Sequence, residues 1–479
     1  MKRGAVEVVL FVEIVMSKLS VLCRVAAGAS RLALAAAVLV ACQGRNTEPE
    51  IVALHGPRYG GLDTTYTFYA VAIDPEGDRV SVRCAWDDGD TSEWSAWAKS
   101  GESIALSHAW QYIDVFHVKA QVKDERGIVG RFGASPACEI TITNQRWATR
   151  LGFDQSLTGP AVGRDGTIFH GAWDTCLFAL HPDGTSRWWQ ELDGTAFFPA
   201  VAPNGTVYLQ SPYSLWAFAE DGTFRWCSPV PGWFDGLHCP SVANDGTIYV
   251  TSADALVAFD STGSVRWQFS PGTALDPTVA LGPDRTVYVG ADWKAVYALS
   301  PDGELKWSYP VAGEVTPIAV DVDGSIVFGV DQALHAVAVD GTLRWRYTPQ
   351  ATVGPPVIGP DRTVYIAAGE RLVAVGSDGR QRWTTRRIDQ PTGCPAVGSD
   401  STIYVGTLQG LVYAVRPDGT IRWHIWFDRA QCGPLTLTQG TLLVGTASGT
   451  LFALNIPGGL ADAPWPMFQH DAGHTGQAR

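Results

Sequence analysis

Two short stretches of the chain carry side chains that could hold a metal ion. His470 and His474 stand four residues apart near the C-terminus, a spacing that puts two imidazoles on one face of a helix. Residues 321–324, Asp-Val-Asp-Gly, begin like a calcium-binding loop. However, Gly473 weakens a helix there, no third ligand is evident, and the Asp-Gly pair falls at a turn that recurs along the chain. We therefore predict that both stretches are structural and that the chain has no metal site.

The sequence motifs of common enzymes are missing. The chain has no H-E-x-x-H, no G-x-S-x-G and no G-x-x-x-x-G-K-[ST], which are the patterns of zinc peptidases, serine hydrolases and phosphate-binding loops. It also has no C-x-x-C-H for a covalently attached haem. We expect no catalytic residue and no cofactor, so the protein is predicted not to be an enzyme.

The N-terminus has the layout of an export signal. Arg24 and Arg31 precede an apolar run, 32–41, that is too short to cross a bilayer. The run ends in Leu-Val-Ala-Cys at 39–42, which resembles the cleavage motif of bacterial lipoprotein signals. That resemblance implies that residues 1–41 are removed, that Cys42 carries the lipid, and that residues 42–50 form a polar tether. Whether translation starts at Met1 or at Met16 stays open.

Charge argues against two classes of partner. Residues 1–41 hold five Lys or Arg and two Asp or Glu, so the rest of the chain has 30 basic against 46 acidic side chains, a net charge of about −16. Such acidity opposes phosphate backbones and anionic lipid surfaces. We expect no nucleic-acid partner, and we expect membrane attachment only through the lipid on Cys42.

An internal repeat of about forty residues supplies the framework for all of these side chains. Each copy contains a Pro-led apolar run, an Asp-Gly type turn, a Thr-Ile-Tyr-Val type run, a Leu-x-Ala-Leu type run with a second turn, and an Arg-Trp run. The Trp markers of the eight copies are Trp147, Trp188, Trp226, Trp267, Trp307, Trp345, Trp383 and Trp423. The Pro markers are Pro160, Pro199, Pro240, Pro277, Pro317, Pro356, Pro395 and Pro434. Short apolar runs with tight turns at a fixed period predict four strands per copy and radially repeated sheets.

The repeat boundaries do not coincide with the ends of the propeller region, because one strand of the last copy is found at the start of that region. The first Arg-Trp run, around Trp147, precedes the first Pro marker, and the last Leu-type run, 450–454, has no Arg-Trp run after it. We therefore predict that residues 145–149 complete the eighth sheet, which would remove an exposed sheet edge.

The repeats resemble the pyrroloquinoline-quinone-type propeller superfamily, in which a Trp near the end of each repeat docks between neighbouring blades. Residues 179–188, Ala-Leu-His-Pro-Asp-Gly-Thr-Ser-Arg-Trp, are a trimmed form of that family's element. The resemblance implies an eight-bladed β-propeller over residues 145–479 with a closing tail that includes 464–471 and His474. A quinone-dependent oxidoreductase stays the weaker alternative, because the chain has no adjacent cysteines and its repeats are nearly uniform.

Residues 51–144 form a different module. They alternate apolar and polar side chains and break at Gly and Asp turns, which predicts a small antiparallel sandwich. The segment resembles the PKD family of extracellular immunoglobulin-like modules through residues 85–90, 108–110 and 122–127. The predicted fold class is thus all-β, an immunoglobulin-like (PKD-like) β-sandwich followed by an eight-bladed β-propeller.

The cysteines allow one predicted pair. Cys84 and Cys138 are the only two in the sandwich, each within an alternating run, so we predict a disulfide between them. Five more lie in the propeller: Cys176, Cys227, Cys239, Cys394 and Cys432. Their pairing stays open, and small buried side chains at inner strands are the simpler interpretation for Cys239, Cys394 and Cys432.

Aromatic side chains mark a candidate binding face. The connections between blades, and those between second and third strands, should meet on one face of a propeller. They hold Trp189, Tyr213, Trp426 and Phe427 in addition to the candidates that we favour for partner binding. Those are Trp173, Phe197, Phe198, Trp233, Phe234 and Trp293. The alternative is that these rings fill the mouth of the propeller.

We interpret the chain as a non-enzymatic exported lipoprotein that binds a protein partner or supports assembly at a bacterial cell envelope, on either the periplasmic or the extracellular side. One specific version is an analogue of the barrel-assembly lipoprotein, from which the added sandwich departs. The partner would be an envelope protein or a glycan, and the propeller a monomer. A carbohydrate-binding surface module is the main alternative.

Overall fold

The computed structural model describes residues 46–478 except 63, 133–136, 153–157, 173–174, 196–197, 232–237, 253 and 428. The predicted signal, Cys42 and the start of the tether lie outside the described residues. Every regular element in the described part is a β-strand, which confirms the all-β class. None of the described residues forms a helix with the length and hydropathy needed to cross a bilayer.

The chain divides into two compact units. One comprises the described residues up to Arg58 together with Tyr66–His108 and Phe116–Ile140. The other comprises Tyr59–Thr65, Ala109–Val115 and everything from Thr141 onward. The second unit thus includes three short segments of the region predicted as the sandwich, namely Tyr59–Thr65, Ala109–Val115 and residues 141–144.

The N-terminal region contains two sheets with opposed buried faces. One has the order β1 (Glu50–His55), β3 (Tyr66–Ile73), β5 (Ser103–His108). The other has the order β2 (Tyr59–Gly60), β7 (Cys138–Ile142), β6 (Asp114–Asp124), β4 (Val80–Ala85). Along β6 every second side chain is buried, the period that one covered face of a sheet requires. Phe68 and Trp86 meet in the core with ring centroids 5.6 Å apart. The relation of this unit to the PKD modules stays a prediction.

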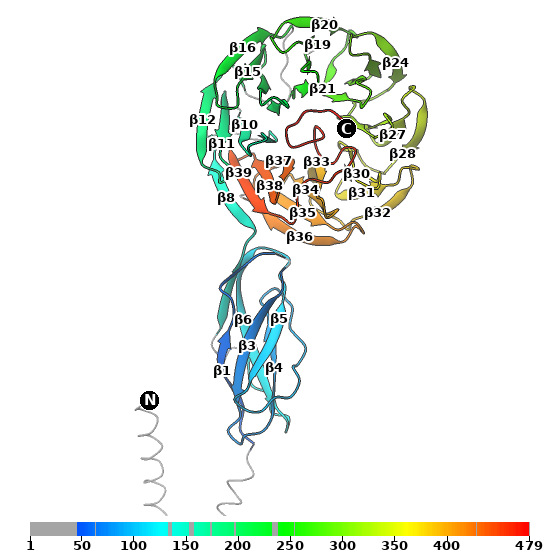
Figure 1. Cartoon of the computed structure of the whole chain (residues 1–479). Helices are drawn as coiled ribbons and strands as arrows, with labels where there is room; N and C mark the ends of the chain where they lie inside the picture. Colours follow the sequence, from blue (N-terminus) through cyan, green and yellow to red (C-terminus); the bar gives the residue numbers. More distant parts are fainter. Residues whose placement is uncertain are drawn as a thin grey trace, which may run out of the picture. The chain divides into compact units, whose positions relative to one another are not determined.

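In the described part of the second unit, eight four-stranded antiparallel sheets follow one another around a ring (Figure 1). The innermost strands are β9 (Ala161–Val162), β13 (Ala200–Val201), β17 (Ser241–Val242), β21 (Leu275–Leu281), β25 (Ala319–Val320), β29 (Val357–Ile358), β33 (Pro391–Val397) and β37 (Cys432–Thr438). The second strands are β10 (Ile168–Gly171), β14 (Val207–Gln210), β18 (Ile248–Thr251), β22 (Val287–Ala291), β26 (Ile326–Val330), β30 (Val364–Ala368), β34 (Ile403–Thr407) and β38 (Thr441–Thr446).

Third strands and outer strands complete the sheets. The third strands are β11 (Cys176–Leu180), β15 (Ser214–Phe218), β19 (Leu256–Phe259), β23 (Ala295–Leu299), β27 (Ala333–Val337), β31 (Arg371–Val375), β35 (Leu411–Val415) and β39 (Thr450–Asn455). The outer strands are β12 (Ser186–Glu191), β16 (Phe224–Pro229), β20 (Val265–Phe269), β24 (Leu305–Pro310), β28 (Leu343–Tyr347), β32 (Gln381–Thr384), β36 (Ile421–Trp426) and β8 (Gln145–Arg150).

The ring closes by pairing its two ends. The last sheet has the order β37, β38, β39, β8, so its outer strand comes from the start of the propeller region. The pairing is antiparallel, with Leu451 opposite Thr149 and Ala453 opposite Trp147. The predicted completion of the last sheet by residues 145–149 is therefore confirmed.

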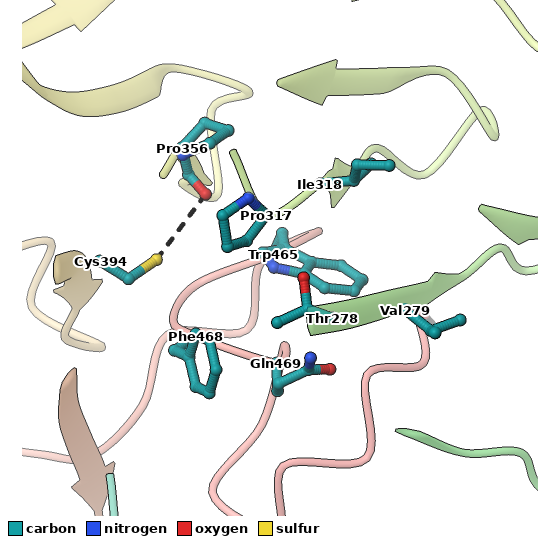
Figure 2. Close-up of a pocket in the computed structure, with 9 residues that line it drawn as sticks. All are labelled: Thr278, Val279, Pro317, Ile318, Pro356, Cys394, Trp465, Phe468 and Gln469. Atoms are coloured by element: carbon teal, nitrogen blue, oxygen red, sulfur yellow. Dashed lines mark hydrogen bonds between the residues drawn. The ribbon is translucent and has the colours of Figure 1, made fainter. Parts of the chain in front are cut away.

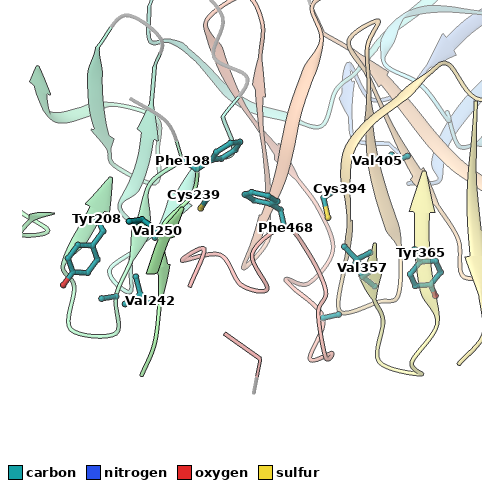
Figure 3. Close-up of a cluster of buried hydrophobic side chains, with 14 of the residues drawn as sticks. Phe198, Tyr208, Cys239, Val242, Val250, Val357, Tyr365, Cys394, Val405 and Phe468 are labelled. Atoms are coloured by element: carbon teal, nitrogen blue, oxygen red, sulfur yellow. The ribbon is translucent and has the colours of Figure 1, made fainter. Parts of the chain in front are cut away.

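Packing between sheets provides the core. Second and third strands such as β22 and β23 are buried along their whole length, because neighbouring sheets cover both of their faces. One large buried cluster joins residues of non-adjacent sheets, among them Val250, Val357 and Val405, with Phe468 of the C-terminal segment (Figure 3). A single sheet would leave both faces in water, so the ring is the unit that folds.

The Trp markers tie each sheet to the next. Trp267 Nε1 donates a hydrogen bond to the carbonyl oxygen of Pro301 at 2.8 Å, and Trp147, Trp188, Trp226, Trp307 and Trp383 donate to equivalent turns of their following sheets. A glycine sits under each ring: a Cβ built on Gly303, whose φ is +86°, would lie 2.7 Å from Trp267 Cδ2. The second Asp-Gly turn of the repeat is thus explained by a positive φ and by contact with an indole ring.

Candidate binding face of the propeller

The strand pairs define one face of the ring. Trp426 at the end of β36 lies opposite Leu411 at the start of β35, and Pro229 at the end of β16 lies opposite Ser214 at the start of β15. The loop between second and third strands and the end of the outer strand therefore share one edge of each sheet. This is the face on which the sequence placed the binding residues.

Three aromatic side chains project from that edge. Trp293 is 68% exposed, Tyr213 54% and Trp426 50%. Tyr213 lies between β14 and β15, Trp293 between β22 and β23, and Trp426 ends β36. We call these three the rim aromatics. Exposed rings on supported turns are the side chains that concentrate binding energy in protein interfaces.

Trp293 is held in a turn that a bulky residue rarely adopts. Its φ is +59°, in the left-handed region. Its amide donates to the carbonyl oxygen of Gly313 at 2.9 Å, and the neighbouring Asp292 Oδ1 accepts from the amide of Val315 at 2.9 Å. These bonds fix the turn from both sides, so the ring is presented to solvent without a flexible backbone beneath it.

A buried carboxyl group lies in the same sheet. Asp276 in β21 is 5% exposed, and burial raises its pKa to about 7, with the carboxylate of Asp292 adding to the rise. Hydrogen bonds from the Thr278 amide at 2.8 Å and from its hydroxyl oppose that effect. Asp276 is therefore protonated over part of the neutral pH range.

The candidates predicted from sequence fall into three groups. Trp173, Phe197, Trp233 and Phe234 lie outside the described residues. Trp293 lies exposed on the expected face. Phe198 is 3% exposed and packs on Phe468 with ring centroids 5.0 Å apart, so the prediction that it contacts a partner is wrong. Phe427 is likewise buried, against Phe452.

The middle of the ring is filled by the C-terminal segment, 456–478, which is red in Figure 1. Its carbonyl oxygens accept hydrogen bonds from the last amide of six innermost strands, in a repeated pattern. The donors are Val162, Val201, Val242, Leu281, Ile358 and Val397, and the acceptors are Ala472, Gly473, Thr475, Gly476, Trp465 and Pro466 in that order. One irregular segment thus joins sheets all around the ring.

Side chains of the C-terminal segment also pack against residues at or just before the innermost strands. Trp465, Phe468 and Gln469 line a cavity of about 10 Å³ together with Thr278 of β21 and with Pro317 and Pro356, which precede β25 and β29 (Figure 2). That volume holds at most one water molecule. Cys394 lies at the same place, its thiol 3.9 Å from the carbonyl oxygen of Pro356.

Both histidines of the segment are buried, as predicted for a structural role. His474 Nδ1 donates to the carbonyl oxygen of Pro199 at 3.2 Å, and its Nε2 lies 3.3 Å from Thr436 Oγ1. Burial lowers the pKa of His474 to about 4. His474 is therefore neutral at pH 7 and links the second sheet to the last one.

The calcium-like stretch is also structural. Asp321 accepts from the guanidinium of Arg362 in the following sheet, at 2.5 Å from its Nη2. Asp323 accepts from the amide of Ser325 and from Arg344 of its own sheet at 2.8 Å. Such Asp–Arg pairs recur at Asp165–Arg187, Asp361–Arg382 and Asp400–Arg422. The turn interpretation of residues 321–324 is confirmed.

One group among the described residues has the geometry to hold a metal ion. The ligand atoms of Asp88, Asp90 and His108 in the N-terminal unit lie within 4.8 Å of one another. His108 Nε2 is 2.6 Å from Asp88 Oδ2, and its ring stacks on Trp86 at 4.9 Å. Sequence reasoning missed this cluster, because its residues belong to two separate motifs that meet only in the fold.

The predicted disulfide between Cys84 and Cys138 is wrong. Both are free thiols. Cys84 lies on β4 and Cys138 on β7, and β6 separates the two strands. Neighbouring strands are about 4.8 Å apart, so the two Cα atoms are roughly 10 Å apart, beyond the reach of a disulfide. Burial raises the pKa of the Cys84 thiol to about 12.

Comparison with known proteins agrees with this architecture. The family model described as "Outer membrane protein assembly factor BamB" matches residues 252–393 and 373–462. The propeller repeats are similar to that family. No curated protein matches the chain.

Solved structures give the fold. BamB from Moraxella catarrhalis is 16% identical, with a TM-score of 0.54 over 66% of this chain and 100% of that one. The Dos1 propeller is 11% identical, with a TM-score of 0.54 over 65% of this chain and 95% of that one. A PKD domain of an M14-like peptidase from Thermoplasmatales archaeon SCGC AB-540-F20 is 33% identical over 20% of this chain and 98% of that one, but its TM-score of 0.19 carries no argument. The propeller-like fold is thus confirmed.

Proposed function

We propose that the chain is an eight-bladed propeller that binds a protein partner at the bacterial cell envelope and has no catalytic activity of its own. The rim aromatics carry this proposal, because these three rings are each 50% or more exposed and lie along one face of the ring. The match of residues 252–462 to a family described as an outer membrane assembly factor supports the location and the kind of role.

The filled centre of the ring favours the rim over an axial site. Among the described residues, a cofactor or substrate entering the C-terminal segment would have to displace Trp465, Phe468 and Gln469, beside which the cavity measures about 10 Å³. Displacement would also break the backbone bonds between the segment and six innermost strands. Recognition on the rim needs no such rearrangement.

Anchoring through Cys42 is part of the same proposal. A lipid there would hold the propeller at a membrane through the tether 42–50. The rest of the chain is acidic and would not bind an anionic membrane by charge, so the lipid would be the means of attachment. In cells fed a radioactive fatty acid, the parent chain should be labelled and the Cys42→Ser variant should not. Equal labelling of both would remove the anchor from the proposal.

Site-specific cross-linking tests the binding face. A photoreactive amino acid placed at Tyr213, Trp293 or Trp426 should join the propeller to the same envelope protein in living cells. Phe224 is the matched control, because it is 54% exposed but starts β16, at the opposite edge of its sheet. Cross-links from position 224 alone, or from none of the four positions, would contradict the proposal.

A further inference from the structure

The outer surface of the N-terminal unit carries a row of alternating rings and cations. Arg83 lies 4.7 Å from the ring centroid of Trp94 and 5.3 Å from that of Phe132. Lys123 lies 4.5 Å from the centroid of Trp94 and 5.3 Å from that of Trp97. The order is Phe132, Arg83, Trp94, Lys123, Trp97. We call it the cation–aromatic row.

Strand pairing sets the positions of the two cations. Arg83 on β4 lies opposite Gln121 on β6, and Lys123 is the next outward residue along β6. Gln121 accepts a hydrogen bond from Arg83 Nε at 2.8 Å. Two like charges on neighbouring strands repel each other, and the negative face of an indole ring next to both of them offsets that cost.

The rings are held by backbone bonds beside the sheet. The segment that carries Trp94 and Trp97 runs along β4, with the amides of Ser92, Ser95 and Ala98 donating to β4 carbonyl oxygens at 2.8–2.9 Å. Arg79 also donates to the carbonyl oxygen of Trp97 at 2.8 Å. The row is therefore ordered before any ligand arrives, which lowers the entropy cost of binding.

The cations of the row have no acidic partner among the described residues, and its end rings keep exposed surface. Among the described residues, no carboxylate lies within ion-pair distance of Arg83 or Lys123, although the chain as a whole has a net charge of −13. The two end rings remain partly open, Trp97 at 39% and Phe132 at 37% exposure. A fitting ligand therefore has flat apolar faces and more than one negative charge.

We propose that the cation–aromatic row binds an anionic polysaccharide whose sugar units carry carboxylates. The C–H faces of the sugar rings stack on Trp97 and Phe132, while the carboxylates pair with Lys123 and Arg83. An acidic peptide has the charge without the flat rings, and an anionic membrane has the charge without a discrete site. The saccharide uses both features of the row.

Affinity electrophoresis of the full chain tests the proposal, with polygalacturonate as the probe at low salt. The parent chain should be retarded by polygalacturonate and not by neutral dextran. Trp97→Ala and the pair Arg83→Gln with Lys123→Gln should each weaken binding at least about tenfold, the size expected for a stacking or charge contact in a small interface. Lys123→Arg should bind as the parent does, because it keeps the cation. Tyr69→Ala is the matched control, since Tyr69 is a 50% exposed ring on β3, in the other sheet.

Melting temperatures measured on the same samples separate binding from folding. If Trp97→Ala unfolds, Phe132→Ala applies the same test at the other end of the row. The proposal is overturned if polygalacturonate does not retard the parent chain or retards the ring variants equally. It is also overturned if polyglutamate or phosphatidylglycerol vesicles bind as well as polygalacturonate, because charge alone would then explain the result.

Discussion

At the scale of residues, the propeller depends on a contact between one indole ring and one glycine in the following sheet. Gly303 shows both requirements: its φ is +86°, and a Cβ there would lie 2.7 Å from Trp267. Gly246 has the same backbone, with φ at +84°, but its nearest neighbour would be Ser261 Cβ at 3.8 Å. The two glycines therefore separate the cost of backbone strain from the cost of lost packing.

We expect Gly246→Ala to lower the free energy of unfolding by about 1–2 kcal/mol, the cost of a left-handed residue with a side chain. Gly303→Ala should cost at least about 2 kcal/mol more, because the methyl group displaces the Trp267 ring and its hydrogen bond. Chemical denaturation of both variants gives the comparison. Equal losses would show that the ring contact contributes nothing.

Buried histidines make the propeller sensitive to acid. Burial lowers the pKa to about 4 for His474 and His238, and to about 3 for His170. Each has a pKa near 6.5 when unfolded, so the unfolded chain binds more protons between those values. The stability that these histidines contribute as neutral side chains is therefore fully present above pH 6.5 and is lost as the pH drops toward 4. The contribution of Asp276 to the pH dependence has the opposite sign. Its pKa is raised to about 7, so the folded chain takes up this proton first, and stability gained as the pH drops through 7 offsets part of the loss.

His474→Asn should reduce this pH dependence. Each titrating histidine contributes a slope of up to about 1.4 kcal/mol per pH unit between its two pKa values. Removing one of them should make the curve of unfolding free energy between pH 4 and 6.5 shallower by roughly that amount, even if the variant is less stable at pH 7. Parallel curves for the variant and the parent would show that His474 does not titrate on unfolding.

At the scale of elements, closure rests on β8. It pairs with β39 from the other end of the propeller, so the ring has no free sheet edge at the join. The outer strand β32 is the natural comparison, because it belongs to a sheet whose four strands follow one another in the chain.

Replacing β8 by a Gly-Ser linker of equal length should lower Tm by at least about 5 °C, because the last sheet loses its outer strand and the ring can open. The same replacement of β32 removes a similar strand but leaves the ring closed, so its effect should be smaller. Differential scanning calorimetry measures both. A larger loss for β32 than for β8 would argue against closure as the source of stability.

Local patterns explain why most elements could be predicted. The Asp-Gly turns, the Thr-Ile-Tyr-Val runs and the Arg-Trp runs are short-range signals, and eight repetitions reinforce them. Errors occurred where the outcome depends on which elements become neighbours. Cys84 and Cys138 lie in correctly predicted alternating runs, but β6 separates their strands. Phe198 lies next to a correctly placed Pro marker, but a segment 270 residues later covers it.

At the scale of the whole molecule, the C-terminal segment acts as a central plug. It accepts backbone hydrogen bonds from six innermost strands and buries Trp465, Met467 and Phe468 among them. No side-chain pattern announces these contacts, because the acceptors are carbonyl oxygens of an irregular segment. Only its aromatic residues and its resemblance to the closing tails of related propellers gave a signal in the sequence.

A chain that ends after Asn455 should have a Tm lower by at least about 5 °C and a broader transition, because the sheets lose their shared partner. Six backbone hydrogen bonds at about 1 kcal/mol each and three buried side chains at about 2 kcal/mol each are removed together. An unchanged and equally sharp transition in calorimetry would show that the sheets hold the ring without the plug.

The central claim is that the propeller recognises a protein through its rim aromatics and not through its axis. The direct measurement is the Kd of the cross-linked partner for Trp293→Ala, with Phe224→Ala as the control and Tm recorded for both. The claim predicts that Trp293→Ala weakens binding by about 2 kcal/mol, roughly thirtyfold, with Tm unchanged, and that Phe224→Ala binds as the parent does. Parent-like affinity in Trp293→Ala, or an equal loss in Phe224→Ala, would contradict it.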